Sequence, residues 1–285
     1  MQGRGPDRSL AWKPVRTADG SWTLAHPVHG ETCHSLAGAW QEARERYAEP
    51  CRLRARARER GTLRLLDVGT GLGLNLAAAL EALAGTGARL AIVSLECSAD
   101  VIRAALALQR GPEGQERWHP FVRGALERAL AAREDGAQAS SSEIVAGDVH
   151  AALRLVLGDA RSTLPALERE ERFDAVFLDP FSPRVEPDLW APAFLAEVAR
   201  RVARGGLLST YSSAFRVRAA LAAAGLEVGA GPRVGTKSSG TLAGRDAAVP
   251  PLDPRTARRL ARALGAPARP PAEEQEQGIP DGRGV

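Results

Sequence analysis

The residues best suited to chemistry lie in a glycine-rich turn in the first third of the chain. An apolar run at Leu63–Val68 predicts a buried strand, and a helical pattern follows at Leu74–Ala84. Between them, glycines spaced G-x-G-x-G follow an acid, and these residues are Asp67, Gly69, Gly71 and Gly73. Glycine lets the backbone adopt positive φ and lets a ligand approach the main chain without a Cβ in the way. A strand, a glycine turn and a helix in this order therefore predict a nucleotide-like ligand.

The spacing of the glycines favours one class of nucleotide. A dinucleotide fingerprint, G-x-G-x-x-G, needs a glycine where this chain has Leu74, whose side chain would block close approach to a pyrophosphate. The turn instead resembles motif I of class I S-adenosylmethionine (SAM) methyltransferases. The next predicted strand, Leu90–Leu95, ends in Glu96, whose carboxylate can accept both hydroxyl protons of a ribose. A turn that serves only strand-to-helix packing is the alternative, and the acid at the strand end favours the cofactor.

A second motif, DPFSP, occupies Asp179–Pro183 after the predicted strand Phe173–Leu178. Catalytic groups of open α/β sheets collect at the carboxyl ends of strands. The string resembles the (Asp/Asn)-Pro-Pro-aromatic motif of methyltransferases that modify amino nitrogens. This resemblance implies that Asp179 orients an acceptor amine and that Phe181 packs on the acceptor. Positioning would then supply most of the acceleration, because a sulfonium methyl is already activated. The alternative is a structural turn with Asp179 as its cap.

A further acid, Asp159, follows the predicted strand Leu153–Leu157. In the methyltransferase pattern an acid at this place lies near the amino group of the adenine. An N-cap or turn aspartate for the next helix is an equally good interpretation.

Composition narrows the class of protein. The chain has 285 residues and a formal net charge of +4, which fits an anionic partner such as RNA without requiring one. Cys33, Cys51 and Cys97 are odd in number and lack C-x-x-C spacing, so neither a disulfide framework nor a zinc site is indicated. We find no apolar run long enough to span a bilayer and no signal peptide, and therefore expect a cytoplasmic protein without membrane contact.

Regular alternation of strands and helices predicts an α/β fold. We expect a doubly wound, mostly parallel, Rossmann-like sheet with a small helical insertion or cap and with the ligand at the carboxyl ends of the strands. Further strands are predicted near Ser21–Ala25 and at Leu207–Tyr211 and Leu226–Gly229. Further helices are predicted at Leu36–Tyr47 with an extension to Gly61, Ala99–Gln109, Phe121–Arg133, Leu189–Ala203, Ala214–Ala224 and Pro254–Leu264.

The predicted domain covers residues 21–249. Residues 1–20 are expected to form a flexible tail, and residues 250–285 a helix followed by a disordered tail. Gly111–Val149 is longer than an ordinary connection, which indicates either a helical cap over the site or a disordered surface loop.

Two polar stretches are better explained by structural roles than by binding of a metal or of RNA. His26–Ser35 holds three histidines, Glu31 and Cys33, but none has helical zinc-site spacing, so a polar loop is favoured and no metal is expected. Five arginines alternate over residues 52–60, and a solvated face is favoured over RNA contact.

Several stretches together resemble one family, the methyltransferase domain of the bifunctional tRNA wobble-uridine enzyme MnmC and its stand-alone relatives. The most specific string is FLDPFSPRVEPDLW at Phe177–Trp190. The others are GETCHSLAGAWQEARERY (Gly30–Tyr47), LLDVGTGLGLN (Leu65–Asn75), GDVHAALRLVLGDA (Gly147–Ala160) and GGLLSTYSSAFRVRAALAAAGLEV (Gly205–Val228).

The resemblance implies methylation, by SAM, of the 5-aminomethyl group on the wobble uridine or 2-thiouridine of tRNA. The motif I residues Asp67, Gly69, Gly71 and Gly73 would then bind the cofactor, Glu96 its ribose and Asp159 its adenine. Asp179 and Phe181 would face the methyl group and the acceptor, and the family places Glu31 and Ser35 near the methionine end of the cofactor. The oxidase half of the bifunctional enzyme is not in the sequence, so a separate enzyme is expected to supply the aminomethyl group.

The same sequence patterns also fit other functions. The same fold serves methyltransferases of small-molecule or protein amines and aminopropyltransferases that use decarboxylated SAM. A catalytically silent RNA-binding module is a further alternative, and it would bind tRNA with strong salt dependence but would not bind SAM.

Overall fold

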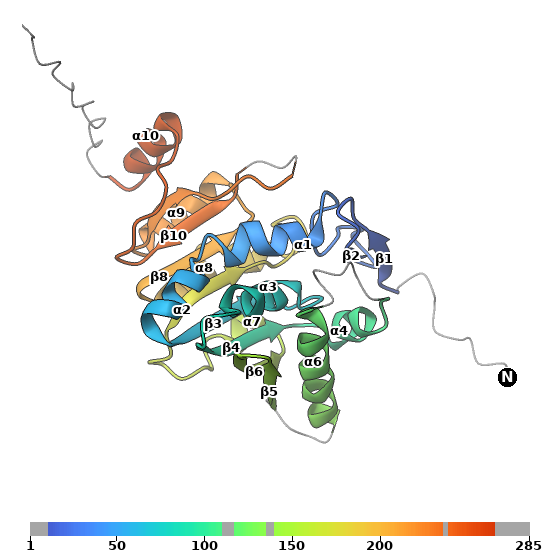
Figure 1. The fold of residues 1–285 in the computed structure, drawn as a ribbon. Helices are drawn as coiled ribbons and strands as arrows, with labels where there is room; N and C mark the ends of the chain where they lie inside the picture. The colour runs from blue at the N-terminus through green and yellow to red at the C-terminus, as the bar shows by residue number, and fades with distance from the viewer. Residues whose placement is uncertain (1–10, 110–116, 135–139, 236–238, 266–285) are drawn as a thin grey trace, which may run out of the picture.

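A central sheet with helices on both faces forms the body of the molecule (Figure 1). The computed structural model describes residues 11–109, 117–134, 140–235 and 239–265. Within them eight strands form one sheet in the order β5-β6-β4-β3-β7-β8-β10-β9. Their bounds are β3 (Thr62–Val68), β4 (Arg89–Glu96), β5 (Ser140–Ala146), β6 (Val149–Leu157), β7 (Phe173–Leu178), β8 (Val202–Thr210), β9 (Glu227–Ala230) and β10 (Thr241–Gly244). A separate hairpin joins β1 (Lys13–Arg16) to β2 (Trp22–Ala25).

The middle of the sheet is parallel, which confirms the predicted doubly wound fold. β3 pairs in parallel with β4 on one side and with β7 on the other, so that Asp67 lies opposite both Ser94 and Phe177. From β3 the chain first builds outward through β4 and β6, and then returns to build β7 and β8 on the other side. Ligands of open α/β sheets bind at such a reversal point, outside the carboxyl ends of the strands. β5 and β10 run antiparallel to their neighbours.

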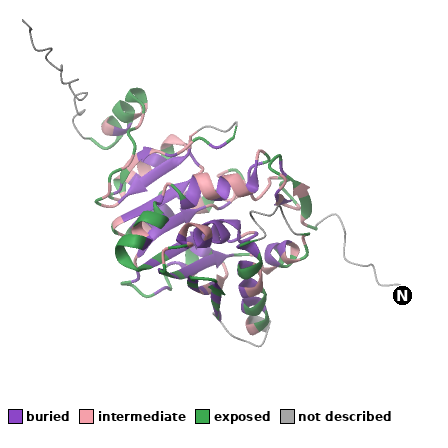
Figure 2. Cartoon of the chain, viewed as in Figure 1, coloured by how far each residue is buried: buried purple, intermediate pink, exposed green. Residues whose placement is uncertain are grey.

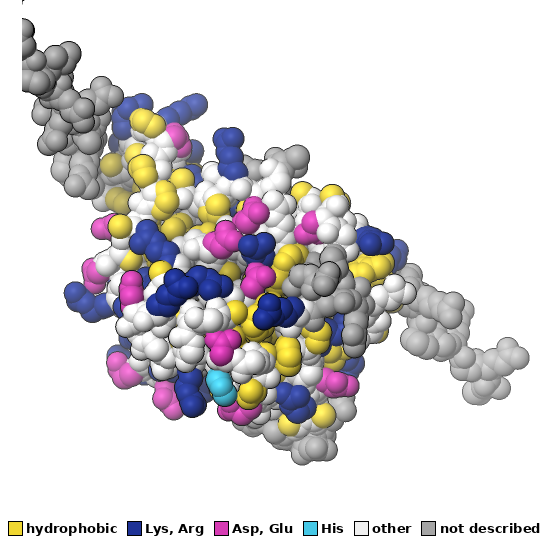
Figure 3. All heavy atoms as spheres, in the orientation of Figure 1, with side chains coloured by type: hydrophobic (Ala, Val, Ile, Leu, Met, Phe, Trp, Pro, Cys, Tyr) yellow, Lys and Arg dark blue, Asp and Glu magenta, His cyan; other side chains and the backbone are white. Residues whose placement is uncertain are grey.

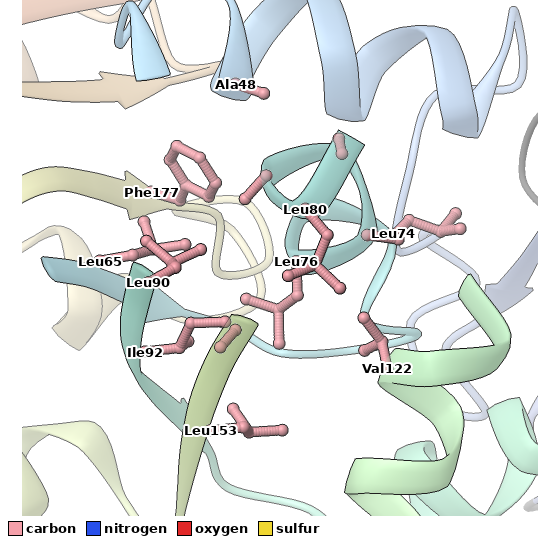
Figure 4. Packing of buried hydrophobic residues seen from close by; sticks show 14 of the residues in the cluster. Ala48, Leu65, Leu74, Leu76, Leu80, Leu90, Ile92, Val122, Leu153 and Phe177 are labelled. Atoms are coloured by element: carbon pink, nitrogen blue, oxygen red, sulfur yellow. The ribbon is translucent and has the colours of Figure 1, made fainter. Parts of the chain in front are cut away.

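Alternation along the strands divides the core between two faces. In β3, Leu65 packs with the cluster on one face and Leu66 with the cluster on the other. Figure 4 shows Leu65, Leu90, Ile92, Leu153 and Phe177 of the first face around the leucines of α3. The first face is covered by α1 (Ala39–Glu42), η2 (Ala43–Ala48), α2 (Leu53–Arg60), α3 (Leu74–Leu83), α4 (Ala99–Leu106) and α6 (His119–Glu134).

The second face is covered by α7, η3, α8 and α9. Their bounds are α7 (Ala160–Thr163), η3 (Pro187–Trp190), α8 (Pro192–Arg201) and α9 (Phe215–Ala223), and α10 (Pro254–Ala263) follows the sheet. Because both faces are covered, β7 is buried at every position, and Figure 2 shows the central strands as the buried layer of the molecule.

Several boundaries differ from the sequence prediction. Residues 13–16 of the expected tail form β1, while residues 1–10 and the C-terminal residues 266–285 lie outside the described residues. The helix predicted from Leu36 to Gly61 is interrupted, because Pro50 cannot continue it and Arg52 takes a left-handed φ of 55°. Gly205 and Gly206 lie inside β8 and do not close the preceding helix.

The long connection Gly111–Val149 contains α6 and the strand β5. α6 confirms the amphipathic helix predicted at Phe121–Arg133, and Val122 and Leu126 pack in the core of the first face. β5 replaces part of the stretch predicted to be flexible, and residues 135–139 between them lie outside the described residues. The described part of this connection is therefore a layer of the fold.

Candidate cofactor and acceptor site

A cavity of about 950 Å³ lies at the carboxyl ends of the parallel strands. Its floor comes from the segments that follow β3, β4, β6 and β7, and its cover comes from the N-terminal region. The cover residues include Trp12, His26, Glu31 and Leu36. No described residue of Gly111–Val149 lines the cavity, and the N-terminal region covers it.

The glycine turn after β3 divides its three glycines between two roles. Gly69 and Gly71 line the cavity with φ of 95° and 48°. A Cβ on Gly69 would lie 2.6 Å from the carbonyl oxygen of Asp179, so a side chain is excluded there. Gly73 does not line the cavity, because it faces α6, and a Cβ would lie 2.8 Å from Cγ1 of Val122. Gly73 therefore leaves room for α6, and its contact with the cofactor stays a prediction.

Glu96 stands at the end of β4 with its carboxylate in the cavity wall. It accepts hydrogen bonds from the backbone N–H of Gly71 (2.9 Å) and of Ser98 (3.0 Å). Burial raises the pKa of Glu96, and these hydrogen bonds oppose the shift. Cys97 Sγ adds a weaker hydrogen bond at 3.5 Å, and the carboxylate lines the cavity, where it can accept from a diol.

Asp67 lies beneath the glycine turn and does not line the cavity. Its Oδ2 accepts a hydrogen bond from Ser94 Oγ (2.6 Å), which also lies 2.6 Å from Thr70 Oγ1 within the turn. Complete burial raises the pKa of Asp67 to about 7, and the hydrogen bond from Ser94 opposes this shift. Asp67 is therefore placed to hold the turn through Ser94 and Thr70, and its contact with a cofactor stays a prediction.

The position of Asp159 agrees with both of its predicted roles, the N-cap of a helix and the contact with the adenine. It is the N-cap of α7, accepting a hydrogen bond from the backbone N–H of Arg161 at 2.9 Å, and it also lines the cavity. Its side-chain hydrogen bond with Arg161 lowers the pKa of Asp159. Arg161 pairs further with Asp188, which fixes this edge of the cavity.

Asp179 is half-buried and is held from two helices. Tyr47 donates its hydroxyl to Oδ1, and Asn75 donates to Oδ2 at 2.8 Å. The backbone N–H of Asp179 donates to the carbonyl of Val68 at 2.9 Å, next to the glycine turn. Burial, followed by the negative charge of Glu42, raises the pKa of Asp179 well above its usual range.

Glu42 is a cavity residue that the sequence analysis missed. It is buried and accepts a hydrogen bond from the backbone N–H of Ser35 at 2.6 Å. Buried Arg46 pairs with it at 3.4 Å. The sequence could have indicated Glu42, because this acid lies one helical turn before Arg46 on a helix face that is otherwise apolar. Tyr47 and Asn75 were also missed, since their contacts with Asp179 are 132 and 104 residues distant in sequence.

Glu31 links the N-terminal cover to the loop that carries the DPFSP motif. Its Oε1 accepts from Ser182 Oγ at 2.6 Å and pairs with Arg184 at 2.9 Å. Burial alone would raise the pKa of Glu31, but these hydrogen bonds outweigh it and lower the pKa. Glu31 lines the cavity as expected, whereas Ser35 does not, because its Oγ accepts from the N–H of Ala37 in a turn.

Phe181 lies under the same cover. Its ring stacks with Trp12 at a centroid distance of 6.1 Å and meets His26 edge-on at 5.2 Å. Its backbone N–H donates to Glu186 and its carbonyl accepts from Trp190, so the loop is fixed on both sides of the ring.

All three cysteines are free thiols. In the described ranges no group of three or more His, Cys, Asp or Glu side chains is arranged to hold a metal ion. None of the helices within these ranges is long and apolar enough to cross a membrane.

Comparisons with known proteins agree with this geometry. The family described as S-adenosyl-L-methionine-dependent methyltransferase matches residues 125–246. The solved structure of MnmC2 from Aquifex aeolicus is 35% identical, with a TM-score of 0.71, over 88% of this chain and 76% of that chain. This chain belongs to the MnmC-type methyltransferase family. It is accordingly a SAM-dependent methyltransferase.

Curated relatives of the family are longer. The bifunctional tRNA 5-methylaminomethyl-2-thiouridine biosynthesis protein MnmC of Aromatoleum aromaticum is 33% identical over 88% of this chain and 38% of its own length. An uncharacterized protein of Methanocaldococcus jannaschii is 29% identical over 80% of this chain and 58% of its own length. The chain thus spans between about two fifths and three fifths of the length of these relatives.

Proposed function

We propose that this methyltransferase transfers the methyl group of SAM to the 5-aminomethyl group on the wobble uridine or 2-thiouridine of tRNA. The observation that carries the proposal is the carboxylate of Asp179, held by Tyr47 and Asn75 at the junction of the glycine turn and the cavity. The substrate is the one in the name of the bifunctional relatives, and an acid motif of amine-specific methyltransferases occupies the expected place.

The residues around the cavity fit the cofactor. Gly69 and Gly71 allow close approach to the main chain, Glu96 has acceptor capacity for the ribose hydroxyls, and Asp159 would lie by the adenine amino group. The family resemblance places Glu31 near the charged methionine end, where the cofactor would meet the loop that Glu31 contacts through Ser182. The bound cofactor supplies an activated methyl group.

Asp179 has the properties that methylation of an amine requires. An alkylamine arrives protonated at neutral pH, and its nitrogen must lose a proton before its lone pair can attack carbon. A carboxylate whose pKa is raised by burial and by Glu42 is suited to accept that proton. Tyr47 and Asn75 orient the carboxylate, so that the amine is held in line while the S–CH₃ bond breaks and the N–CH₃ bond forms.

The rim of the cavity is compatible with RNA. The side chains of Arg161 and Arg184 are 52% and 72% exposed even while they are paired with acids. Basic side chains also lie over α2 and α10, interspersed with acidic ones (Figure 3). Since methylation needs an existing aminomethyl group, we propose that a separate enzyme supplies it.

The test is transfer of labelled methyl from SAM to tRNA that carries 5-aminomethyluridine. We expect label in this tRNA and none in unmodified tRNA. Asp179→Asn should reduce the rate at least about a hundredfold, as removal of a proton acceptor does, with SAM binding retained. Asp246→Asn, an acid in a surface ion pair with Arg204, is the matched control and should be neutral.

Two results would contradict the proposal. If tRNA stays unlabelled while SAM binds, the acceptor is another molecule, and small amines are the next substrates to test. If the Asp179→Asn variant methylates tRNA at the wild-type rate, the acceptor site lies elsewhere.

A further inference from the structure

Three aromatic rings meet at the cavity, and two of them come from outside the motifs that predicted the site. Trp12 precedes β1 and His26 follows β2, and both contact Phe181 of the DPFSP loop. Trp12 and His26 also meet edge-on at 5.1 Å. All three residues line the cavity and are partly exposed, so each ring keeps a surface for a ligand.

The protonation state of His26 follows from the turn after it. Its Nδ1 accepts hydrogen bonds from the backbone N–H groups of Val28 (3.1 Å) and His29 (3.2 Å). A nitrogen that accepts two N–H groups carries no proton, so the proton resides on Nε2. Burial, together with the nearby His29, lowers the pKa of His26 and keeps the ring neutral. Nε2–H is therefore a fixed donor at the cavity.

We propose that Trp12 and His26, together with Phe181, bind the base that carries the acceptor amine. The rings of Trp12 and Phe181 stack with the pyrimidine, and Nε2–H of His26 donates to a carbonyl oxygen of that base. Trp12 and Phe181 lie close together with planes 26° apart, so the base stacks on their cavity side and does not enter between them. This inference rests on the proposed function.

Two further observations favour a nucleobase as the ligand. Phe181 is two residues from Asp179 in the same loop, so a base on these rings lies next to the proton acceptor. Leu36 of the cover lines the same cavity and is 56% exposed, which leaves apolar surface for a ligand. Proteins that read unpaired RNA bases combine aromatic stacking with hydrogen bonds to the base edge in this way.

The test separates base binding from cofactor binding. With tRNA carrying 5-aminomethyluridine, Trp12→Ala should raise KM about tenfold to a hundredfold, as loss of one stacking partner does. His26→Asn keeps a side-chain acceptor for the turn but lacks the Nε2 donor, and should raise KM about threefold to tenfold. In both variants the Kd for SAM should stay within about twofold of wild type, because neither residue belongs to the glycine turn or to Glu96.

Matched controls are available on the same cover. Trp12→Phe keeps a ring and should retain most of the affinity for tRNA. Trp22 of β2 contacts Arg16 and does not line the cavity, so Trp22→Ala should leave KM unchanged. An unchanged KM in both Trp12→Ala and His26→Asn would overturn the inference while leaving the proposed function intact.

A binding measurement keeps the two proposals separable. The nucleoside 5-aminomethyluridine should quench tryptophan fluorescence in wild type, and the quench should be lost in Trp12→Phe while the nucleoside still binds. If wild type shows no turnover with tRNA but this quench is present, the proposed function fails and the base site stands. If the quench persists in Trp12→Phe, the base binds elsewhere and the inference fails.

Discussion

Two parts of the cavity are built in different ways: the part proposed to hold the cofactor, at the ends of β3 and β4 (the cofactor half), and the part proposed to hold the acceptor, around the loop after β7 (the acceptor half). In the cofactor half, Gly71 donates to Glu96 between the ends of adjacent parallel strands, and backbone groups provide most of the contacts. In the acceptor half, side chains from the N-terminal region contact the loop after β7, as Tyr47 does with Asp179 and Glu31 with Ser182. The first half depends on the sheet, and the second on a cover that is fixed by polar and aromatic side chains.

This difference separates two kinds of change. A substitution in the cofactor half should act on SAM affinity, because the strand ends and the glycine turn are one rigid unit. A substitution in the acceptor half should act on the tRNA substrate and on the rate. Substitutions at Gly69, Glu96, Glu31 and Glu42 test this division.

The largest effect is expected at Gly69. Gly69→Ala adds a Cβ 2.6 Å from the carbonyl of Asp179 at a φ of 95°, so the turn must move. SAM affinity, measured by calorimetry, should fall at least about a hundredfold. Gly85→Ala is the control, since Gly85 has a φ of 73° with no atom within 4 Å of a Cβ. It should lose about 1 kcal/mol of stability and no SAM affinity. Equal SAM affinities in the two variants would contradict the role of Gly69.

Glu96→Gln should have the next largest effect. Hydrogen bonds to a charged group contribute about 1.5–3 kcal/mol, so the Kd for SAM should rise about tenfold to a hundredfold. Glu143→Gln, an exposed acid on β5, is the matched control. A wild-type Kd in Glu96→Gln would remove Glu96 from the cofactor half.

Glu31→Gln tests where the two halves meet. The change weakens the contacts with Ser182 and Arg184, so the rate with tRNA should fall about threefold to tenfold while the Kd for SAM changes less. The rate with tRNA and the Kd for SAM both come from one steady-state experiment in which the concentration of each substrate is varied. If the Kd for SAM rises as much as in Glu96→Gln, Glu31 belongs to the cofactor half, as the family resemblance implied.

The smallest effect is a shift in the pH profile. Asp179 must be ionised to accept a proton, and its pKa is raised by burial and by Glu42, so the rate falls as pH decreases through that raised pKa. Glu42→Gln removes a negative neighbour and lowers the Asp179 pKa, which moves the acid limb to lower pH by about half a unit to one unit. Glu49→Gln, an exposed acid after η2, should leave the limb in place. A shift to higher pH would refute this coupling.

The cofactor half was predictable because its signals are local. An apolar strand, glycines and an acid at the next strand end are contiguous patterns, and they located Gly69, Gly71 and Glu96. Within the same pattern, Gly73 packs against α6 and Asp67 supports the turn, because a turn needs glycines and acids for packing and support as well as for ligands.

The acceptor half was predictable only at Asp179, Phe181 and Glu31. Tyr47, Asn75 and Trp12 act through contacts between distant parts of the chain, which no single sequence displays. β5 was missed for a related reason. Two of its four buried positions carry serine, so the alternation typical of a strand was hidden in a string that also suits a loop.

The order of these parts along the chain has an evolutionary consequence. Trp12, His26, Glu31, Glu42 and Tyr47 all precede β3, whereas the glycine turn, Glu96 and Asp159 follow within the sheet. Asp179 itself is anchored through its main chain, by the hydrogen bond to Val68 and the close approach to Gly69. One contiguous N-terminal segment can therefore diverge or be exchanged between lineages, and new acceptors can be recruited without rebuilding the machinery that delivers the methyl group.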